Sequence, residues 1–381
     1  MEPVDFMIGA LSQRAAEGLA VAVLLYAGAT GYYAWRGFQT GLADRWSALL
    51  ATLVMVALAA LLRTDGARVL PAPFSVWLLV VYLAGIVVTL TWTLGRYQER
   101  IDRFREQFGA RLNALLAERL PEDRLAEWRR LRDRFQGDEE GRRKTPHLLM
   151  GVFLVIYLVA GRALLRGVAD LADATLDGGE AVANLYLASH SGYLVAGHVT
   201  ALFGLMGLLF LVLPNELLRL KYPELSYPFK ATILQRLRER EKGLFGAHYY
   251  IVATLPLAAI GLTRDPATWT WSIPAVIAVV CVTVFADAAS ALVGIRFGRR
   301  KWFHHAGKSY LGTVGGMVVA FLVALPFIGV PGGVAAAVVF AAVDALSPVP
   351  FPASDNILHP VALAAAFLVL DGAVSPLFPF Y

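Results

Sequence analysis

One aspartate of this sequence lies inside an apolar segment, where an acid needs a compensating partner. Asp287 stands in the run VFADAASALVG, and a basic turn follows it. A carboxylate at membrane depth costs several kcal/mol unless a cation or a metal ion compensates it. We therefore expect Asp287 to be functional, and an ion pair with a neighbouring helix is the alternative.

The turn after Asp287 combines positive charge with glycines. Arg299 and Arg300 supply charge without any acid, as a polyphosphate site requires. Retention of a basic connection in the cytoplasm would also explain them. The positive charge of the turn is therefore explained either by a phosphate ligand or by the positive-inside rule alone.

The triplet Gly307–Ser309 with its central Lys308 is superficially similar to a nucleotide-binding loop. It is not a Walker A motif, because Trp302 stands where the first glycine belongs and no strand precedes it. Backbone N–H groups, the lysine and the hydroxyls of Ser309 and Thr313 still favour an anion site at a helix N-terminus. Gly312 and Gly316 suit that site, a packing seam between helices, or both.

Two further acids flank the last apolar segments. Asp344 ends one segment, and Asp355 with Asn356 precedes the next. Taken alone, Asp355 is a good helix N-cap. Together the acids are expected to face the basic turn from the same side of the membrane, and oxygen ligands of this kind suit Mg²⁺ bridged to substrate phosphates.

Two other polar clusters lie at the ends of apolar segments. Arg142, Arg143 and Lys144 precede a segment as a positive-inside anchor would, whereas His147 at the membrane edge is harder to explain that way. Glu216 and Arg219 are spaced for a surface salt bridge on one helix.

The composition is that of a polytopic membrane protein. Of 381 residues, 57% are hydrophobic and 17% are charged, which is too apolar for soluble domains. The one cysteine, Cys281, excludes a disulfide framework and a cysteine metal cluster. A span needs roughly 20 mainly apolar residues. The ten candidate spans lie near 15–35, 46–63, 74–94, 147–166, 192–213, 247–263, 271–294, 312–329, 332–346 and 357–374.

The charges of the connections orient these spans. Lysine and arginine concentrate in 95–146, 214–246 and 295–311, whereas 167–191 is acidic. The positive-inside rule then places both termini outside and the basic connections in the cytoplasm, together with 347–356. We predict an all-α integral membrane protein of about ten transmembrane helices.

Three regions follow from this pattern. Residues 1–95 form an accessory module of three spans, 96–140 a charged helical hairpin, and 141–381 a domain of seven spans. The hairpin's amphipathic helices are expected on the cytoplasmic leaflet or packed on one another. Acidic residues interleaved among its basic ones argue against nucleic-acid binding.

Four motifs together resemble a known group of enzymes. They are RRKTPH at Arg142–His147, FADAASALVGIRFG around Asp287, GKSYLGT from Gly307, and SDN at Ser354–Asn356 followed by Pro360. Their order and spacing are similar to those of the dolichol kinase, phytol kinase and CTP-dependent diacylglycerol kinase group, relatives of the phosphatidate cytidylyltransferases. The resemblance covers roughly residues 140–375.

The resemblance implies a lipid kinase of phospholipid metabolism that uses Mg²⁺ and takes a phosphoryl group from CTP or another nucleoside triphosphate. The acceptor is the hydroxyl of a lipid alcohol such as a polyprenol, a phytol-like alcohol or diacylglycerol. The positions that match the group's motifs are Asp287, Lys308, Ser309, Gly312, Thr313, Asp355 and Asn356. Two positions depart from it: Ala286 replaces the usual glycine and Leu311 the usual glutamate.

A hypothesis for the site follows. Asp287, Lys308 and His147 are the catalytic candidates, with Asp287 or His147 accepting the hydroxyl proton. The candidates for nucleotide binding are Arg143, Lys144, Arg299, Arg300, Ser309, Gly312 and Thr313. Asp287, Asp355 and Asn356 are the candidate metal ligands.

Two rival functions remain open. One is synthesis of a CDP-lipid by a phosphatidate cytidylyltransferase-type reaction. The other is a membrane transporter or lipid-binding protein, which would place polar residues across the full depth of the membrane. The polar clusters on one face favour the enzyme, in a plasma membrane or an ER-like membrane, with the active site on the cytoplasmic side. The expected partners are the nucleotide, the lipid alcohol and membrane lipids, and a homodimer is compatible with the sequence.

Overall fold

The fold is described from a computed structural model of the whole chain. The residues that the structure describes are 3–42, 44–70, 72, 74–94, 107, 114, 121, 122, 124, 126, 166, 167, 170, 171, 174, 193–221, 244–349, 351–371, 373, 375 and 377. The predicted span 147–166 lies outside this part of the chain, apart from position 166, and so does most of the charged hairpin 96–140. Arg142, Arg143, Lys144 and His147 also lie outside it.

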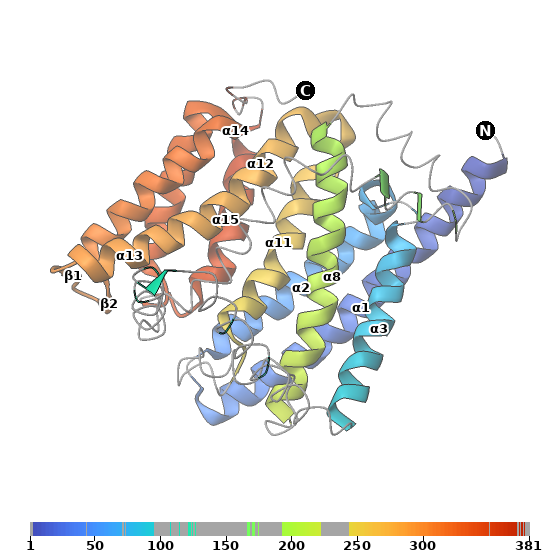
Figure 1. Cartoon of the computed structure of the whole chain (residues 1–381), viewed down its shortest axis with the longest axis horizontal. Helices are drawn as coiled ribbons and strands as arrows, with labels where there is room; N and C mark the ends of the chain where they lie inside the picture. The colour runs from blue at the N-terminus through green and yellow to red at the C-terminus, as the bar shows by residue number, and fades with distance from the viewer. Residues whose placement is uncertain are drawn as a thin grey trace.

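Helices make up nearly all of the described structure (Figure 1). Up to residue 221 the described helices are α1 (Pro3–Thr40), α2 (Arg45–Val69), α3 (Phe74–Leu94) and α8 (Tyr193–Lys221). The C-terminal half contributes α11 (Ala247–Thr263), the 3₁₀ turn η2 (Pro266–Thr268), α12 (Trp269–Cys281), the π-helical η3 (Val282–Ala286), α13 (Asp287–Phe297), α14 (Tyr310–Leu346) and α15 (Asp355–Leu370). A small antiparallel hairpin of β1 (Lys301–Trp302) and β2 (His305–Ser309) joins α13 to α14.

Four helical segments of the described residues are long and apolar enough to cross a membrane. They are Gly9–Thr40, Arg45–Val69, Trp269–Phe297 and Tyr310–Leu346. This confirms a mostly helical chain with membrane-spanning character. The predicted count of ten spans is not established by it, because the other apolar helices of this part are shorter.

Helix α14 is a hairpin of two helical halves. Gly329 has φ 66° and interrupts the helix, a conformation that glycine adopts without strain. Beyond it the chain returns along its own path, since a Cβ at Gly333 would lie 3.1 Å from the Phe321 ring and one at Gly316 would lie 2.2 Å from the Phe340 ring. The two halves correspond to the predicted segments 312–329 and 332–346. The reversal brings the end of α14 back beside its beginning.

Glycines let the first half of α14 approach α13 closely. A Cβ at Gly312 would lie 2.8 Å from the Ser290 carbonyl oxygen and 3.0 Å from the Gly294 Cα. Any larger residue would push the two helices apart. The packing seam considered for Gly312 and Gly316 is therefore present in the fold.

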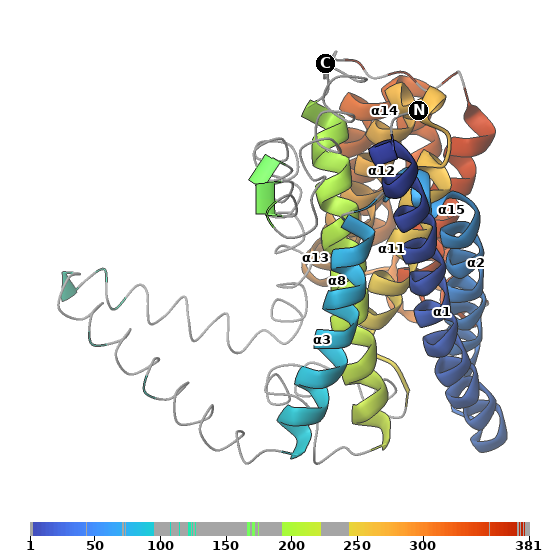
Figure 2. The same cartoon turned by 90° about the vertical axis from the view of Figure 1, so that its right-hand side faces the viewer.

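The buried core runs without a break from α1 to α15. Figures 1 and 2 show α1 beside α2 and α3 beside α8, and α2 also packs against α11. The Ser354 N–H, just before α15, donates to the buried Ser47 hydroxyl of α2 over 2.9 Å. The N-terminal helices thus share one core with the helices that carry the polar motifs, and the proposed three-region division stays a prediction.

The pair Glu216 and Arg219 is buried, so its interpretation as a surface salt bridge is wrong. Arg219 Nη2 lies 2.9 Å from Glu216 Oε2 and also donates to the Leu244 carbonyl. The Gly246 N–H donates to the same Glu216 oxygen over 3.2 Å. The pair joins the end of α8 to the start of α11. The ion pair and the hydrogen bonds to the backbone compensate the burial of both charges.

Candidate functional site

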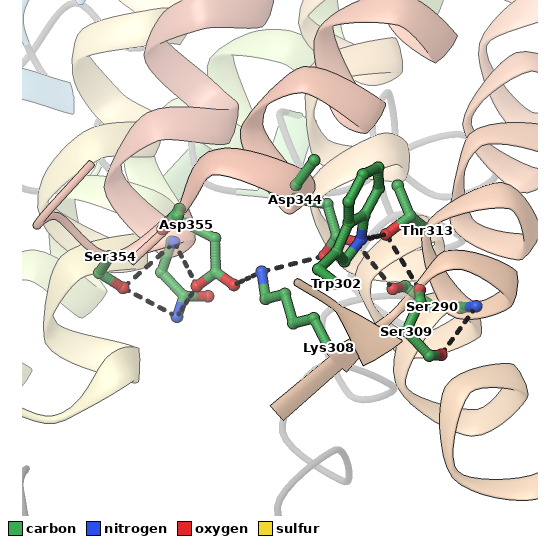
Figure 3. A network of polar contacts seen from close by, with 12 residues as sticks. Ser290, Trp302, Lys308, Ser309, Thr313, Asp344, Ser354 and Asp355 are labelled. Atoms are coloured by element: carbon green, nitrogen blue, oxygen red, sulfur yellow. Dashed lines mark hydrogen bonds and ion pairs between the residues drawn. The ribbon is translucent and has the colours of Figure 1, made fainter. Parts of the chain in front are cut away.

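A lysine held between two acids forms the centre of the polar site (Figure 3). Lys308 Nζ lies 3.0 Å from Asp344 Oδ1 and 2.8 Å from Asp355 Oδ2. The three side chains come from β2, the end of α14 and the start of α15. Their side chains are only 19%, 4% and 25% exposed, so water screens these charges weakly.

The acids keep the lysine charged. Burial by itself lowers the pKa of Lys308, but the carboxylates of Asp355 and Asp344 outweigh burial, and the net shift of the pKa is upward. A lysine ammonium has three donors, and the two carboxylates use two of them. Among the described residues, no further acceptor of the ammonium is found.

Hydroxyl groups complete the surroundings of Asp344. Thr313 Oγ1 donates to Asp344 Oδ2 over 2.5 Å, and Ser290 Oγ donates to the same oxygen over 3.4 Å. The indole N–H of Trp302 donates to Thr313 Oγ1 over 3.1 Å. Trp302, the residue that rules out a Walker A motif, is thus linked to Asp344 through the Thr313 hydroxyl.

The predicted anion-binding residues at the start of α14 are buried. Ser309 caps the helix, since its Oγ accepts the Gly312 N–H over 3.1 Å. Ser309, Gly312 and Thr313 are all enclosed by the protein and bonded within it. Their role in nucleotide binding stays a prediction. In the structure, Ser309 caps the helix directly after Lys308, and Thr313 donates to Asp344.

Asp355 is not the N-cap of α15, contrary to the prediction from that residue alone. Ser354 has the extended backbone of a cap, and its Oγ accepts the Asn356 N–H over 3.3 Å. Asp355 is already helical and accepts the Asn356 N–H at Oδ1 over 3.1 Å. The shift of the cap by one residue leaves Asp355 Oδ2 for Lys308.

Asp287 belongs to the same neighbourhood. It is half-buried and begins α13 directly after the π-helical turn η3, a type of distortion frequent at functional sites. Both η3 and α13 pack against α14. Ser290, which follows Asp287 by three positions on α13, donates to Asp344 Oδ2 over 3.4 Å, so the start of α13 lies beside the lysine cluster.

No family model, curated protein or solved structure matches the chain. The resemblance of the motifs to the dolichol kinase group therefore stays a prediction.

The basic turn lies next to the buried cluster. Arg299, Arg300 and Lys301 are exposed, and the register of the hairpin pairs Lys301 with Ser309. The exposed cations thus occupy the segment beside the strand that carries Lys308.

Leu311 is exposed, unlike the residues that follow it. Its side chain is 47% exposed in the first turn of α14, whereas Gly312 and Thr313 on the next positions are buried. The departure from the usual glutamate thus lies at an exposed position of α14.

The described residues contain no group of three or more His, Cys, Asp or Glu side chains placed to hold a metal ion. Both oxygens of Asp344 and both of Asp355 already accept hydrogen bonds. Binding of Mg²⁺ by Asp287, Asp355 and Asn356 therefore stays a prediction. It would use one or two carboxylates from the protein, with the remaining ligands from phosphates and water.

Asp344 was expected from sequence as an acid facing the basic turn, and it is more buried than Asp287. His359 was not among the candidates from sequence. His359 has a weaker signal, since it follows Asp355 by one helical turn in an otherwise apolar helix.

Proposed function

We propose that this chain is a membrane-embedded lipid kinase. It transfers the terminal phosphoryl group of CTP, or of another nucleoside triphosphate, to the hydroxyl of a lipid alcohol. The observation that carries the proposal is the lysine held between Asp344 and Asp355 at one end of apolar helices. Such a place lets a water-soluble phosphate and a lipid meet.

The phosphate side of the reaction needs charge and position. Phosphoryl transfer is catalysed mainly by positioning and electrostatic stabilisation. Lys308 has one ammonium donor beyond those used by the two acids, and that donor is suited to a phosphate oxygen. Arg299 and Arg300 extend the positive surface toward water, and Arg143 and Lys144 are predicted to join them. Ser309, Gly312 and Thr313 would hold this frame.

Mg²⁺ would supply neutralisation of the phosphates, and Asp287 and Asp355 would hold it with Asn356 beside them. The lipid alcohol would enter between helices, with its chain remaining in the bilayer. Asp287 or His147 would take the hydroxyl proton. In the full proposal ten helices span the membrane, and the site lies on its cytoplasmic side.

The proposal is tested by following which phosphate of CTP enters the lipid. Purified protein is incubated with Mg²⁺, CTP labelled at either the α or the γ phosphate, and a panel of polyprenol, phytol, diacylglycerol and phosphatidate. Label from γ in the lipid supports the kinase, and label from α identifies a cytidylyltransferase instead. If neither label enters lipid, the enzyme proposal is overturned in favour of a transporter or lipid-binding protein.

Variants connect the activity to the site. Asp287→Asn should abolish turnover while the protein remains folded. Asp65→Asn is the matched control, because Asp65 lies on α2, and its recorded partner is the neighbouring Thr64. Near-normal activity of the Asp287 variant would show that the site has been assigned wrongly.

A further inference from the structure

A buried histidine next to the lysine cluster lacks a hydrogen-bond partner. His359 is 2% exposed, and its Nε2 atom is enclosed without a donor or acceptor among the described residues. Leaving a buried polar atom unpaired destabilises the folded state. A hydrophobic residue at this position of α15 would avoid that cost, so a role for the nitrogen itself is expected.

Packing fixes the orientation of the ring. The imidazole of His359 stacks on Phe340, with centroids 4.7 Å apart and planes inclined by 7°. Phe340 in turn lies against the backbone of Gly316, where a Cβ would come within 2.2 Å of the ring. The α14 hairpin therefore holds the imidazole in one plane rather than letting it turn to find a partner.

The ring lies one helical turn beyond the acid that begins α15. Four helical positions, about 6 Å along the axis, separate His359 from Asp355, so both lie on the same face of α15. Asp355, Lys308, Asp287 and Asp344 all act electrostatically on the imidazole. The phosphates of a donor belong at the charged end, and a lipid hydroxyl belongs at the apolar end.

The two acids that hold Lys308 already accept a hydrogen bond at each carboxylate oxygen. Asp344 accepts from Lys308 at one oxygen and from Thr313 at the other. Asp355 accepts from Lys308 and from Asn356. A hydroxyl that reaches the cluster from the apolar side finds in Nε2 a nitrogen that these bonds leave unused.

We infer that His359 binds the acceptor hydroxyl of the lipid alcohol through Nε2 and receives its proton. This assignment rests on the proposed function, and it gives the role of base to α15 in place of Asp287 or His147. The hydroxyl oxygen forms a bond to the terminal phosphorus, and the bond from that phosphorus to the bridging oxygen breaks. The nucleoside diphosphate leaves with the electron pair, and the proton ends on Nε2.

Kinetics of a ring-preserving variant test the assignment. His359→Phe keeps an aromatic ring to stack on Phe340 and removes the nitrogen. It should lower kcat/KM for the alcohol by about 10²-fold or more, while the KM for the nucleotide changes by less than about 3-fold, since a positioned base acts on the alcohol alone. His198→Phe is the matched control, because His198 is an equally buried histidine on α8, bonded to Thr263 over 3.1 Å.

A binding measurement tests the same contact without turnover. In wild-type protein with ¹⁵N-labelled histidine rings, the Nε2 signal of His359 should shift when geraniol or dioctanoylglycerol is added without nucleotide. The signal is assigned by its loss in His359→Phe, or in His359→Gln if the first variant does not fold. An unchanged signal, or a variant with wild-type kcat/KM, overturns the inference. If wild type labels no lipid, the kinase proposal fails, and the shift alone decides whether His359 binds the hydroxyl.

Discussion

Lys308 and Asp355 are 47 positions apart in the sequence, yet 2.8 Å separates the Nζ of one from the Oδ2 of the other. The reversal of α14 at Gly329 makes this contact, because the whole hairpin lies between the two residues. The same reversal sets Asp344 on the other side of the ammonium. One bend in one helix therefore assembles the polar site.

Removal of the lysine should leave two acids facing each other without a cation. Lys308→Met is expected to lower the free energy of unfolding by about 3–5 kcal/mol, since a buried ion pair that loses one partner leaves an uncompensated charge. The loss is measured by denaturant titration of purified protein in mixed micelles.

A second substitution shows whether the loss arises from the pair. In Lys308→Met/Asp344→Asn, the loss should be smaller than the sum of the two single losses by about 0.5–3 kcal/mol. Losses that simply add would mean that the two side chains do not stabilise each other.

Thr313 connects Asp344 to Trp302, and its hydroxyl should matter more than its shape. Thr313→Val keeps the branched shape but removes the donor to Asp344 and the acceptor for the indole N–H. We expect a loss of about 1–3 kcal/mol in unfolding free energy. Thr64→Val, which removes only exposed bonds to the backbone of its own helix and to the neighbouring Asp65, should change stability by less than about 0.5 kcal/mol. Equal stability of the two variants would contradict the network.

Two glycine substitutions should have opposite effects. Gly316→Ala places a methyl group 2.2 Å from the Phe340 ring and 2.9 Å from the Ser290 Cβ, and overpacking of this kind costs about 1–3 kcal/mol. Gly28→Ala lies on α1 with no atom within 4 Å of the new Cβ, and should stabilise the helix by up to about 1 kcal/mol. Thermal unfolding of the two variants decides this. A stabilised Gly316 variant would mean that the α14 hairpin is looser than described.

The contribution of Lys308 should depend on pH only under alkaline conditions. Burial lowers its pKa, but Asp355 and Asp344 outweigh burial and raise the pKa above the ordinary 10.5. A group whose pKa is raised by folding stabilises the folded state fully below the unfolded value, and that stability is lost as the pH rises through the folded value.

Unfolding free energies of wild type and Lys308→Met measure this dependence. Their difference should be constant from about pH 7 to about pH 10 and should shrink at higher pH. A difference that already shrinks between about pH 7 and about pH 9 would show that the pKa of Lys308 is lowered in the folded protein.

Several elements follow from the sequence because their causes are local. The apolar runs predicted as spans at 74–94 and 247–263 coincide with α3 (Phe74–Leu94) and α11 (Ala247–Thr263). Hydrophobic length and flanking polar residues decide where such a helix begins and ends. The placement of Asp344 and Asp355 toward the basic turn also followed from the alternation of spans.

Other features depend on how the helices pack. The sequence alone determined that apolar helices alternate with charged connections, and that several costly polar residues lie at their ends. Only the tertiary structure decided that Lys308 bonds to Asp344 and Asp355, that Glu216 and Arg219 are buried, that Leu311 faces outward, and that His359 lies beside the charges. The physical reason is that hydrophobic periodicity sets which face of a helix is buried, whereas the partner of a buried charge depends on contacts between residues far apart in the chain.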